Sequence, residues 1–298
     1  MRRNIRSRAR AVVLAAPLAV LIAACSGDTA APDTQPLDDA EALLIGRGIA
    51  AEVRDMTRLL DVGDLLTPSF PGLALHPRPG FQCATLDPFP PEDSDGDGVP
   101  NTLTVTFTLP ACSFTHRGHT VEITGTVLIT DPSETAFGFR IEITALQEKR
   151  TDAEGRFRLR RLDGLVQVLR SATEFSVIDQ TTAVHESSEG HSASLAKDWV
   201  VEFDADDGEV IDGWRHLPSG RLTVNGRTTR TRGDRVHSLE IATLTPLHFD
   251  ATCDAEQQFD AGVLVITRLH PEHSVTIRVE FTGCGEEPVV TLVPPPGA

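Results

Sequence analysis

The segment TLTVTFTL, residues 102–109, alternates strictly between threonine and an apolar residue. In an extended strand, successive side chains point to opposite faces, so a period of two places all the apolar residues on one face. One face on a core and one face in water is typical of an antiparallel sheet. We therefore predict a strand whose core-facing residues are Leu103, Val105, Phe107 and Leu109.

The same alternation recurs at residues 137–143, 199–203 and 275–281. Turn-forming dipeptides lie between such stretches. They are Asp131-Pro132, Glu154-Gly155, Asp163-Gly164, Asn225-Gly226 and Gly233-Asp234. We predict a mainly β protein in which about ten to thirteen strands over residues 102–293 form a large antiparallel sheet. Because closure limits exposed edges, the sheet is expected to curl into a barrel-like or sandwich domain.

One N-terminal helix is predicted before the sheet, over residues 37–66. Asp38 and Glu41 have a spacing similar to that of a capping box. Apolar residues then roughly follow one helical face, which is expected to pack on the β domain. These residues are Leu44, Ile49, Val53, Met56 and Leu60.

A proline-rich segment, residues 67–101, separates the helix from the sheet. Proline disfavours regular structure over most of this segment, so we predict a linker or a long loop lying on the domain. The last five residues, 294–298, have the sequence PPPGA and are predicted to be a disordered tail.

The first 24 residues have the pattern of a secretory signal peptide. Five arginines precede an apolar run over residues 11–24, which is short for a helix that crosses a membrane. The run ends Ile22-Ala23-Ala24-Cys25, which resembles the lipobox of bacterial lipoproteins. That resemblance implies fatty acyl chains such as palmitate on the Cys25 thiol, and multiple chains give stable membrane anchoring. Residues 25–36 would then form a flexible tether.

The cysteine count agrees with lipidation. There are five cysteines, and an acylated Cys25 leaves four that can pair in an oxidising compartment. Three pairings of these four are possible. We favour Cys83 with Cys112 and Cys253 with Cys284, because each pair encloses about thirty residues of local β structure.

The chain is acidic, with a formal net charge of −16. Residues 1–24 hold five arginines and no acid, so their removal would take the charge to −21. This balance argues against binding of nucleic acid through its phosphates. We expect a lipid-anchored protein of the cell envelope, and Ser26 after the cysteine is compatible with sorting to the outer membrane.

The most specific motif is DSDGDGVPN, residues 93–101. Oxygen ligands at alternating positions of a tight loop can converge on Ca²⁺. We expect them from the side chains of Asp93, Asp95, Asp97 and Asn101 and from the carbonyl of Val99. The loop also resembles a single thrombospondin type 3 repeat unit, which implies a calcium site. It departs from that unit at Asn101, which replaces the usual aspartate.

Other motifs favour structure over chemistry. Two HxxH pairs fall in expected hairpin turns and not on a helix, which argues against zinc. They are His116 with His119 and His270 with His273. Ser194 to Lys197 matches SxxK, but the segment leads directly into a strand and lacks the partner motifs of that enzyme class. The acidic run at 204–212 is expected to be a solvated loop.

The whole chain resembles bacterial lipoproteins of uncharacterised activity. They combine a lipobox, an acidic DSDGDGVP loop, a Leu-Pro-Ala-Cys step (residues 109–112) and a terminal Thr-Gly-Cys-Gly (residues 282–285). We expect a non-enzymatic structural or interaction role, with another envelope protein as a candidate partner. The alternative is a carrier that encloses an apolar ligand or lipid within the curled sheet. Its pocket would be lined by Phe107, Phe137, Phe139, Trp199 and Phe203.

Overall fold

The computed structural model describes residues 39–59, 83–116, 118–133, 137–211, 217–233, 235–269 and 274–293, with side chains of the helix described up to residue 54. The predicted signal peptide, tether and tail, together with Cys25, lie outside these ranges. Within them, no helix combines the length and the apolar character that crossing a membrane requires.

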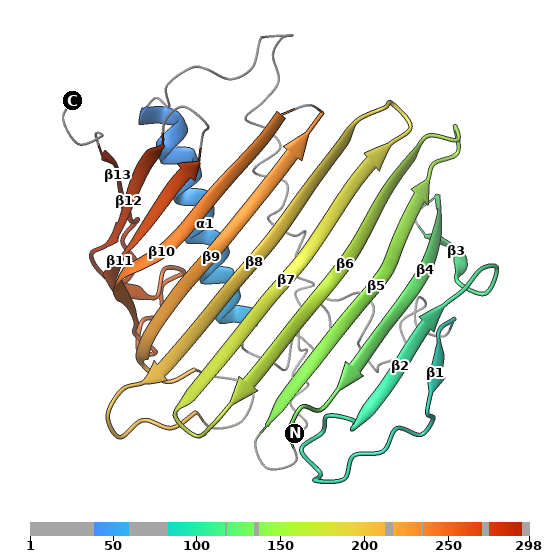
Figure 1. The fold of residues 1–298 in the computed structure, drawn as a ribbon, viewed down its shortest axis with the longest axis horizontal. Helices are drawn as coiled ribbons and strands as arrows, with labels where there is room; N and C mark the ends of the chain where they lie inside the picture. Colours follow the sequence, from blue (N-terminus) through green and yellow to red (C-terminus); the bar gives the residue numbers. More distant parts are fainter. Residues whose placement is uncertain are drawn as a thin grey trace, which may run out of the picture. The chain divides into compact units, whose positions relative to one another are not determined.

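Thirteen strands form one antiparallel sheet, which confirms the predicted fold class (Figure 1). Apart from β3, which pairs only with β4, each strand lies beside its neighbours in sequence, as successive hairpins require. The strands are β1 (Thr85–Asp87), β2 (Thr102–Phe107), β3 (Ser113–His116), β4 (His119–Thr130), β5 (Gly138–Thr151), β6 (Phe157–Arg170), β7 (Glu174–Ser187), β8 (Ser192–Ala205), β9 (Gly220–Arg232), β10 (Arg235–Phe249), β11 (Phe259–Leu269), β12 (Val275–Phe281) and β13 (Val289–Val293).

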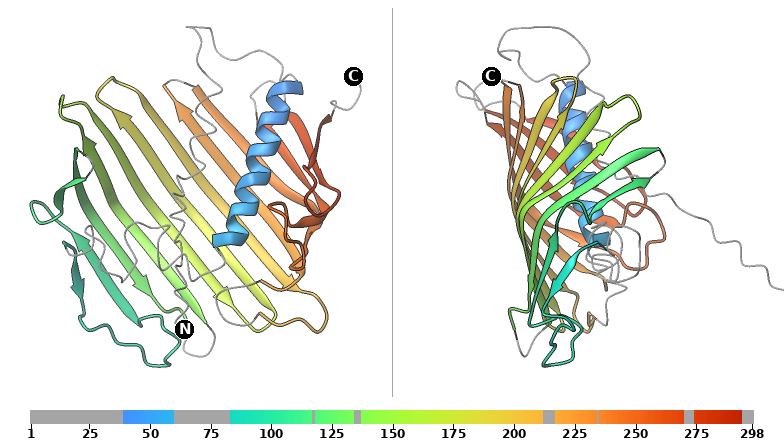
Figure 2. Two further views of the ribbon diagram at one scale, coloured as in Figure 1. Left: turned by 180° about the vertical axis from the view of Figure 1, so that it is seen from behind. Right: turned by 90° about the vertical axis from the view of Figure 1, so that its right-hand side faces the viewer.

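The sheet begins earlier than the sequence pattern indicated. β1 lies within the segment predicted to be a linker, and Thr85–Asp87 pair with Thr104–Thr106 of β2. Among the described residues, β1 and β13 end the strand order without a second neighbour, so the sheet is open. Figure 2 shows that it is also strongly curled.

The predicted alternation places the core correctly. The residues that were expected to face inward on β5, β8 and β12 are buried, except Val275 at the start of β12, which is partly buried. Ile141, Trp199 and Ile277 have no exposed surface. Leu109 is an exception, because β2 ends at Phe107 and the Leu109 side chain is 47% exposed. Alternation therefore identifies the inward face but not the point at which the strand ends.

Helix α1 (Asp39–Leu59) crosses one face of the sheet, hereafter the helix-side face (Figure 2). Ile49 and Val53 are buried against the sheet, as predicted. Leu44 was wrongly assigned to this face, since its side chain is 53% exposed. Two ion pairs hold the helix to the sheet, one from Glu41 in its first turn to Arg268 on β11 and one from Glu52 in its second half to Lys197 on β8.

Two predicted turns lie inside strands. Asp163-Gly164 belongs to β6 and Asn225-Gly226 belongs to β9. Gly164 and Gly226 have positive φ angles of 134° and 151°. A Cβ atom at either position would lie 2.1 Å from a backbone oxygen of a neighbouring strand. Glycine is required there because neighbouring backbones approach closely where the strands bend. The resulting Asp-Gly and Asn-Gly dipeptides are the same as those that mark turns, which explains the wrong prediction.

Candidate functional site

Both predicted disulfides are present. Cys83–Cys112 joins the segment before β1 to the turn before β3, with Cα atoms 4.9 Å apart. Cys253–Cys284 joins the loop after β10 to the loop after β12, with Cα atoms 5.9 Å apart. These two bonds use four of the five cysteines of the chain and leave Cys25 outside either bond.

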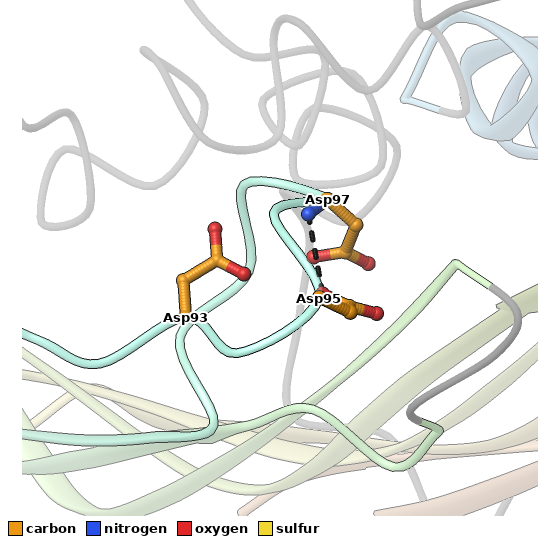
Figure 3. A group of neighbouring side chains, drawn as sticks. All are labelled: Asp93, Asp95 and Asp97. Atoms are coloured by element: carbon orange, nitrogen blue, oxygen red, sulfur yellow. Dashed lines mark hydrogen bonds between the residues drawn. The ribbon is translucent and has the colours of Figure 1, made fainter.

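The acidic loop between β1 and β2 gathers three of the predicted calcium ligands. Asp93, Asp95 and Asp97 each offer a carboxylate oxygen, and these oxygens lie within 4.8 Å of one another (Figure 3). The loop holds this shape through its own backbone amides. Gly96 and Gly98 both donate to Asp93, at 2.8 and 3.0 Å, and Asp97 donates to Asp95 at 3.2 Å. The local fold is therefore an acidic turn that concentrates negative charge.

Asp97 is the carboxylate with the most unfavourable surroundings. Its Oδ1 accepts a hydrogen bond from the Val99 amide at 2.7 Å, whereas its Oδ2 is buried without a partner. Burial raises the pKa of Asp97, and the negative charges of Asp95, Asp131 and Asp93 raise it further, against the lowering effect of the Val99 amide. A cation beside Oδ2 would relieve both the desolvation and the repulsion.

Asp131, at the end of β4, was not among the predicted ligands. It approaches the loop because its amide donates to the carbonyl of Asn101 at 3.3 Å. β2 and β4 are paired, with Thr102 opposite Thr130, and this pairing brings Asp131 near Asp97. The signal in the sequence is weak, since an acid 34 residues away joins the loop only through sheet register.

The other two predicted ligands have additional roles. The Asn101 side-chain oxygen accepts hydrogen bonds from the amide and the hydroxyl of Ser94, both at 3.0 Å, and so closes the loop. The Val99 side chain is 1% exposed and belongs to the hydrophobic core. Val99 therefore fixes the acidic loop to the sheet.

A second ionisable cluster was missed from the sequence. His248 on β10 bonds Asp260 of β11 through Nδ1 at 2.7 Å and Asp206 of the loop after β8 through Nε2 at 2.9 Å. The hydrogen bond with Asp206, and then that with Asp260, raise the pKa of His248 above its usual value, against partial desolvation. A ring that donates from both nitrogens is an imidazolium, so the cluster is a charged clamp between two strands and a loop.

The weaker motifs have structural positions. His116 and His119 are cross-strand partners in the β3–β4 hairpin, as expected. Ser194 and Lys197 lie within β8, and Lys197 contacts Glu52 at 3.1 Å. His270 and His273 lie outside the described residues.

The acidic run after β8 is partly structural. Asp204 closes β8, and Asp206 accepts from His248, whereas Asp212 lies outside the described residues. The run was predicted to be only a solvated loop, and that interpretation is wrong for Asp206. A histidine 42 residues away supplies its partner through sheet register.

The aromatic residues proposed to line a pocket lie in the core. Phe107, Phe139, Trp199 and Phe203 are at most 3% exposed, and Phe137 is packed beside them. Phe203 stacks on Phe175 with ring centroids 5.0 Å apart. Four of the five side chains are therefore almost completely shielded from solvent, and Phe137 is partly buried.

Three comparisons with known proteins found no relative of the chain. No family model, no curated protein and no solved structure matches it.

Proposed function

We propose that this protein is a lipid-anchored, non-enzymatic protein of the cell envelope, whose sheet serves as a structural or interaction scaffold. The observation that carries the proposal is the pairing of four cysteines with one another, which leaves Cys25 of the lipobox-like sequence as the fifth. Disulfides are typical of oxidising compartments, where lipoproteins reside. The single sheet with its crossing helix would serve as the platform of such a scaffold.

Intact mass spectrometry of the protein purified from bacterial membranes tests the anchor. We expect the mature chain to begin at Cys25, to carry acyl mass there, and to partition into the detergent phase. A Cys25→Ser chain should keep the uncleaved N-terminus and carry no acyl mass. A wild-type chain that begins elsewhere, or carries no acyl group, contradicts the proposal.

The acidic loop is proposed to bind Ca²⁺ weakly, and so to steady the start of the sheet. The support is the convergence of Asp93, Asp95 and Asp97, with the buried, unpartnered Oδ2 of Asp97 and the added charge of Asp131. Asp93, Asp95 and Asp97 would supply carboxylate oxygens to the ion. Open loops of this kind in extracellular proteins bind calcium at about 0.1–1 mM.

Calorimetric titration with CaCl₂ tests this site. We expect binding by the wild-type chain and loss of the heat in Asp95→Ala. Asp207→Ala, in the exposed loop after β8, removes the same charge elsewhere and should leave binding unchanged. Equal heats from all three chains would remove calcium from the proposal.

A second candidate function is the transport of an apolar ligand or lipid. One observation favours it: α1 crosses the concave side of a curled, open sheet, as a cover would (Figure 2). Native mass spectrometry of the protein from its own envelope distinguishes the two. A co-purifying apolar molecule at a fixed stoichiometry supports the carrier, and its absence supports the scaffold.

A further inference from the structure

Six arginines gather on the helix-side face, on the half of the sheet beyond the glycine bends. We call this set the arginine band: Arg150 (β5), Arg158 and Arg160 (β6), Arg230 and Arg232 (β9), and Arg235 (β10). Register places them on one face. Arg160, His185, Ala193, Arg232 and Arg235 are successive cross-strand partners, and residues two apart on a strand share a face.

The band contrasts with the charge of the chain, which is −16. On these strand ends the same face carries one acid, Glu148, which pairs with Arg150. The opposite face mixes both signs, with Arg161 and Arg227 near Asp163 and Asp198. Positive charge is therefore concentrated on one side of the sheet.

Two pairs of these arginines are direct cross-strand partners. Arg150 lies directly opposite Arg158, and Arg232 lies directly opposite Arg235. Like charges in directly opposite positions destabilise a sheet. An anion bound between the arginines would turn this repulsion into attraction, because guanidinium groups form paired, charge-assisted hydrogen bonds with phosphate or carboxylate oxygens.

The band has two sides with a floor of small residues between them. The β6 arginines and the β9 arginines are three strand spacings apart, or roughly 14 Å. Between them, on β7 and β8, the helix-side face presents small residues such as Ala193 and Ser187. Long arginine side chains therefore flank a strip of shorter side chains, which we call the trough.

His185 lies on the floor of the trough. Its Nε2 atom is buried and makes no hydrogen bond. Burial, and then the nearby positive charge of Arg160, lower the pKa of His185. A buried ring nitrogen without a partner is uncommon in folded proteins, and an anionic oxygen in the trough would supply the missing acceptor to its N–H tautomer.

The trough meets an apolar row on its inner side. Leu146, Leu162, Ala183 and Leu195 are successive cross-strand partners, one row nearer the core than Arg160 and His185. Leu146 and Leu162 pack against the core and are partly exposed. Charge beside apolar surface matches a molecule that has an anionic head and an apolar tail.

We propose that the arginine band binds the phosphate headgroup of an anionic lipid, with the acyl chains directed along the leucine row. Arg158 and Arg160 on one side, and Arg232 on the other, contact the phosphate oxygens. The proposal deepens the second candidate function by naming its ligand class, and it does not depend on acylation of Cys25.

Binding of short-chain phosphatidic acid, measured by calorimetry, tests the proposal. Every chain in the assay carries Cys25→Ser, so that none of them is acylated and a failed anchor leaves the assay valid. Arg158→Gln/Arg160→Gln removes two arginines from the band. Arg161→Gln/Arg227→Gln removes the same charge from the opposite face of the same sheet. Short-chain phosphatidylcholine and inorganic phosphate are the comparison ligands.

We expect phosphatidic acid to bind, and binding to weaken at least about tenfold in the band variant but less than about twofold in the control. The affinity of the unmodified band for phosphatidic acid should also fall as the NaCl concentration rises from about 0.05 to about 0.5 M. This result does not depend on whether any variant folds. The proposal is overturned if phosphatidic acid binds both variants with equal affinity. It is also overturned if the unmodified band binds phosphatidylcholine as tightly as phosphatidic acid. Inorganic phosphate binding as tightly as phosphatidic acid also overturns it, since the site would then recognise a free anion.

Discussion

Glu52 on α1 lies 3.1 Å from Lys197 on β8, and the Lys197 ammonium lies 4.9 Å from the centre of the Trp199 ring. Both charged side chains are 19% exposed, so solvent screens this pair less than a surface pair. The contact connects the helix to Trp199, the largest fully buried side chain among the described residues.

Glu52→Gln should lower the free energy of unfolding by about 1–3 kcal/mol, because it leaves the Lys197 ammonium partly buried without a counter-charge. Urea denaturation at pH 7 measures the change. The control is Glu287→Gln, which breaks the exposed pair between Glu287 and Arg47 and should cost less than about 0.5 kcal/mol. Equal effects of the two substitutions would show that the helix does not depend on the inner pair.

Thr228→Val should destabilise the sheet although it keeps side-chain volume. Trp199 Nε1 donates to the Thr228 hydroxyl at 2.9 Å, and both residues are buried. Loss of the acceptor leaves the indole N–H unsatisfied, at a cost of about 1–3 kcal/mol. Thr231→Val, on the opposite face of β9, is the matched control, and a similar loss there would refute the role of the hydrogen bond. Denaturant unfolding followed by tryptophan fluorescence measures both.

Gly226→Ala should be far more harmful than a typical loop substitution. The new Cβ would lie 2.1 Å from the Asp198 carbonyl oxygen, and the φ angle of 151° disfavours a side chain. We expect a loss of about 3 kcal/mol or failure to fold. Gly190 also has a positive φ, but a Cβ there meets nothing within 4 Å, so Gly190→Ala should cost about 1 kcal/mol. Thermal unfolding monitored by circular dichroism compares them.

The His248 clamp should make stability depend on pH. Hydrogen bonds to Asp206 and Asp260 raise the folded-state pKa of His248 above the unfolded value of about 6.5. Its stabilisation is therefore fully present below about pH 6.5 and is lost as pH rises through the folded pKa. The stability difference between wild type and His248→Gln should be larger at about pH 6 than at about pH 9. Urea titrations at the two pH values measure it, and a difference that grows with pH would contradict the clamp.

Short-range pattern predicted much of this protein. Alternation at residues 102–107 and 275–281 marks strands because the period of a strand is set by its own backbone. The acidic loop was located for the same reason, since Asp93, Asp95 and Asp97 converge through turns that they make themselves. Short-range pattern fails at Gly164 and Gly226, where turns were wrongly predicted. Those glycines are required because the backbone of a neighbouring strand approaches closely.

By itself, then, the sequence determined the alternating strands, the helix and the acidic loop, and it favoured the pairing of Cys83 with Cys112 and of Cys253 with Cys284. Only the tertiary structure decided which distant side chains meet. Arg160 shares a face with Arg232, and His248 lies between Asp206 and Asp260, because sheet register places separate strands side by side. Register is a property of the whole sheet, since a shift of one residue would move every side chain of a strand to the other face.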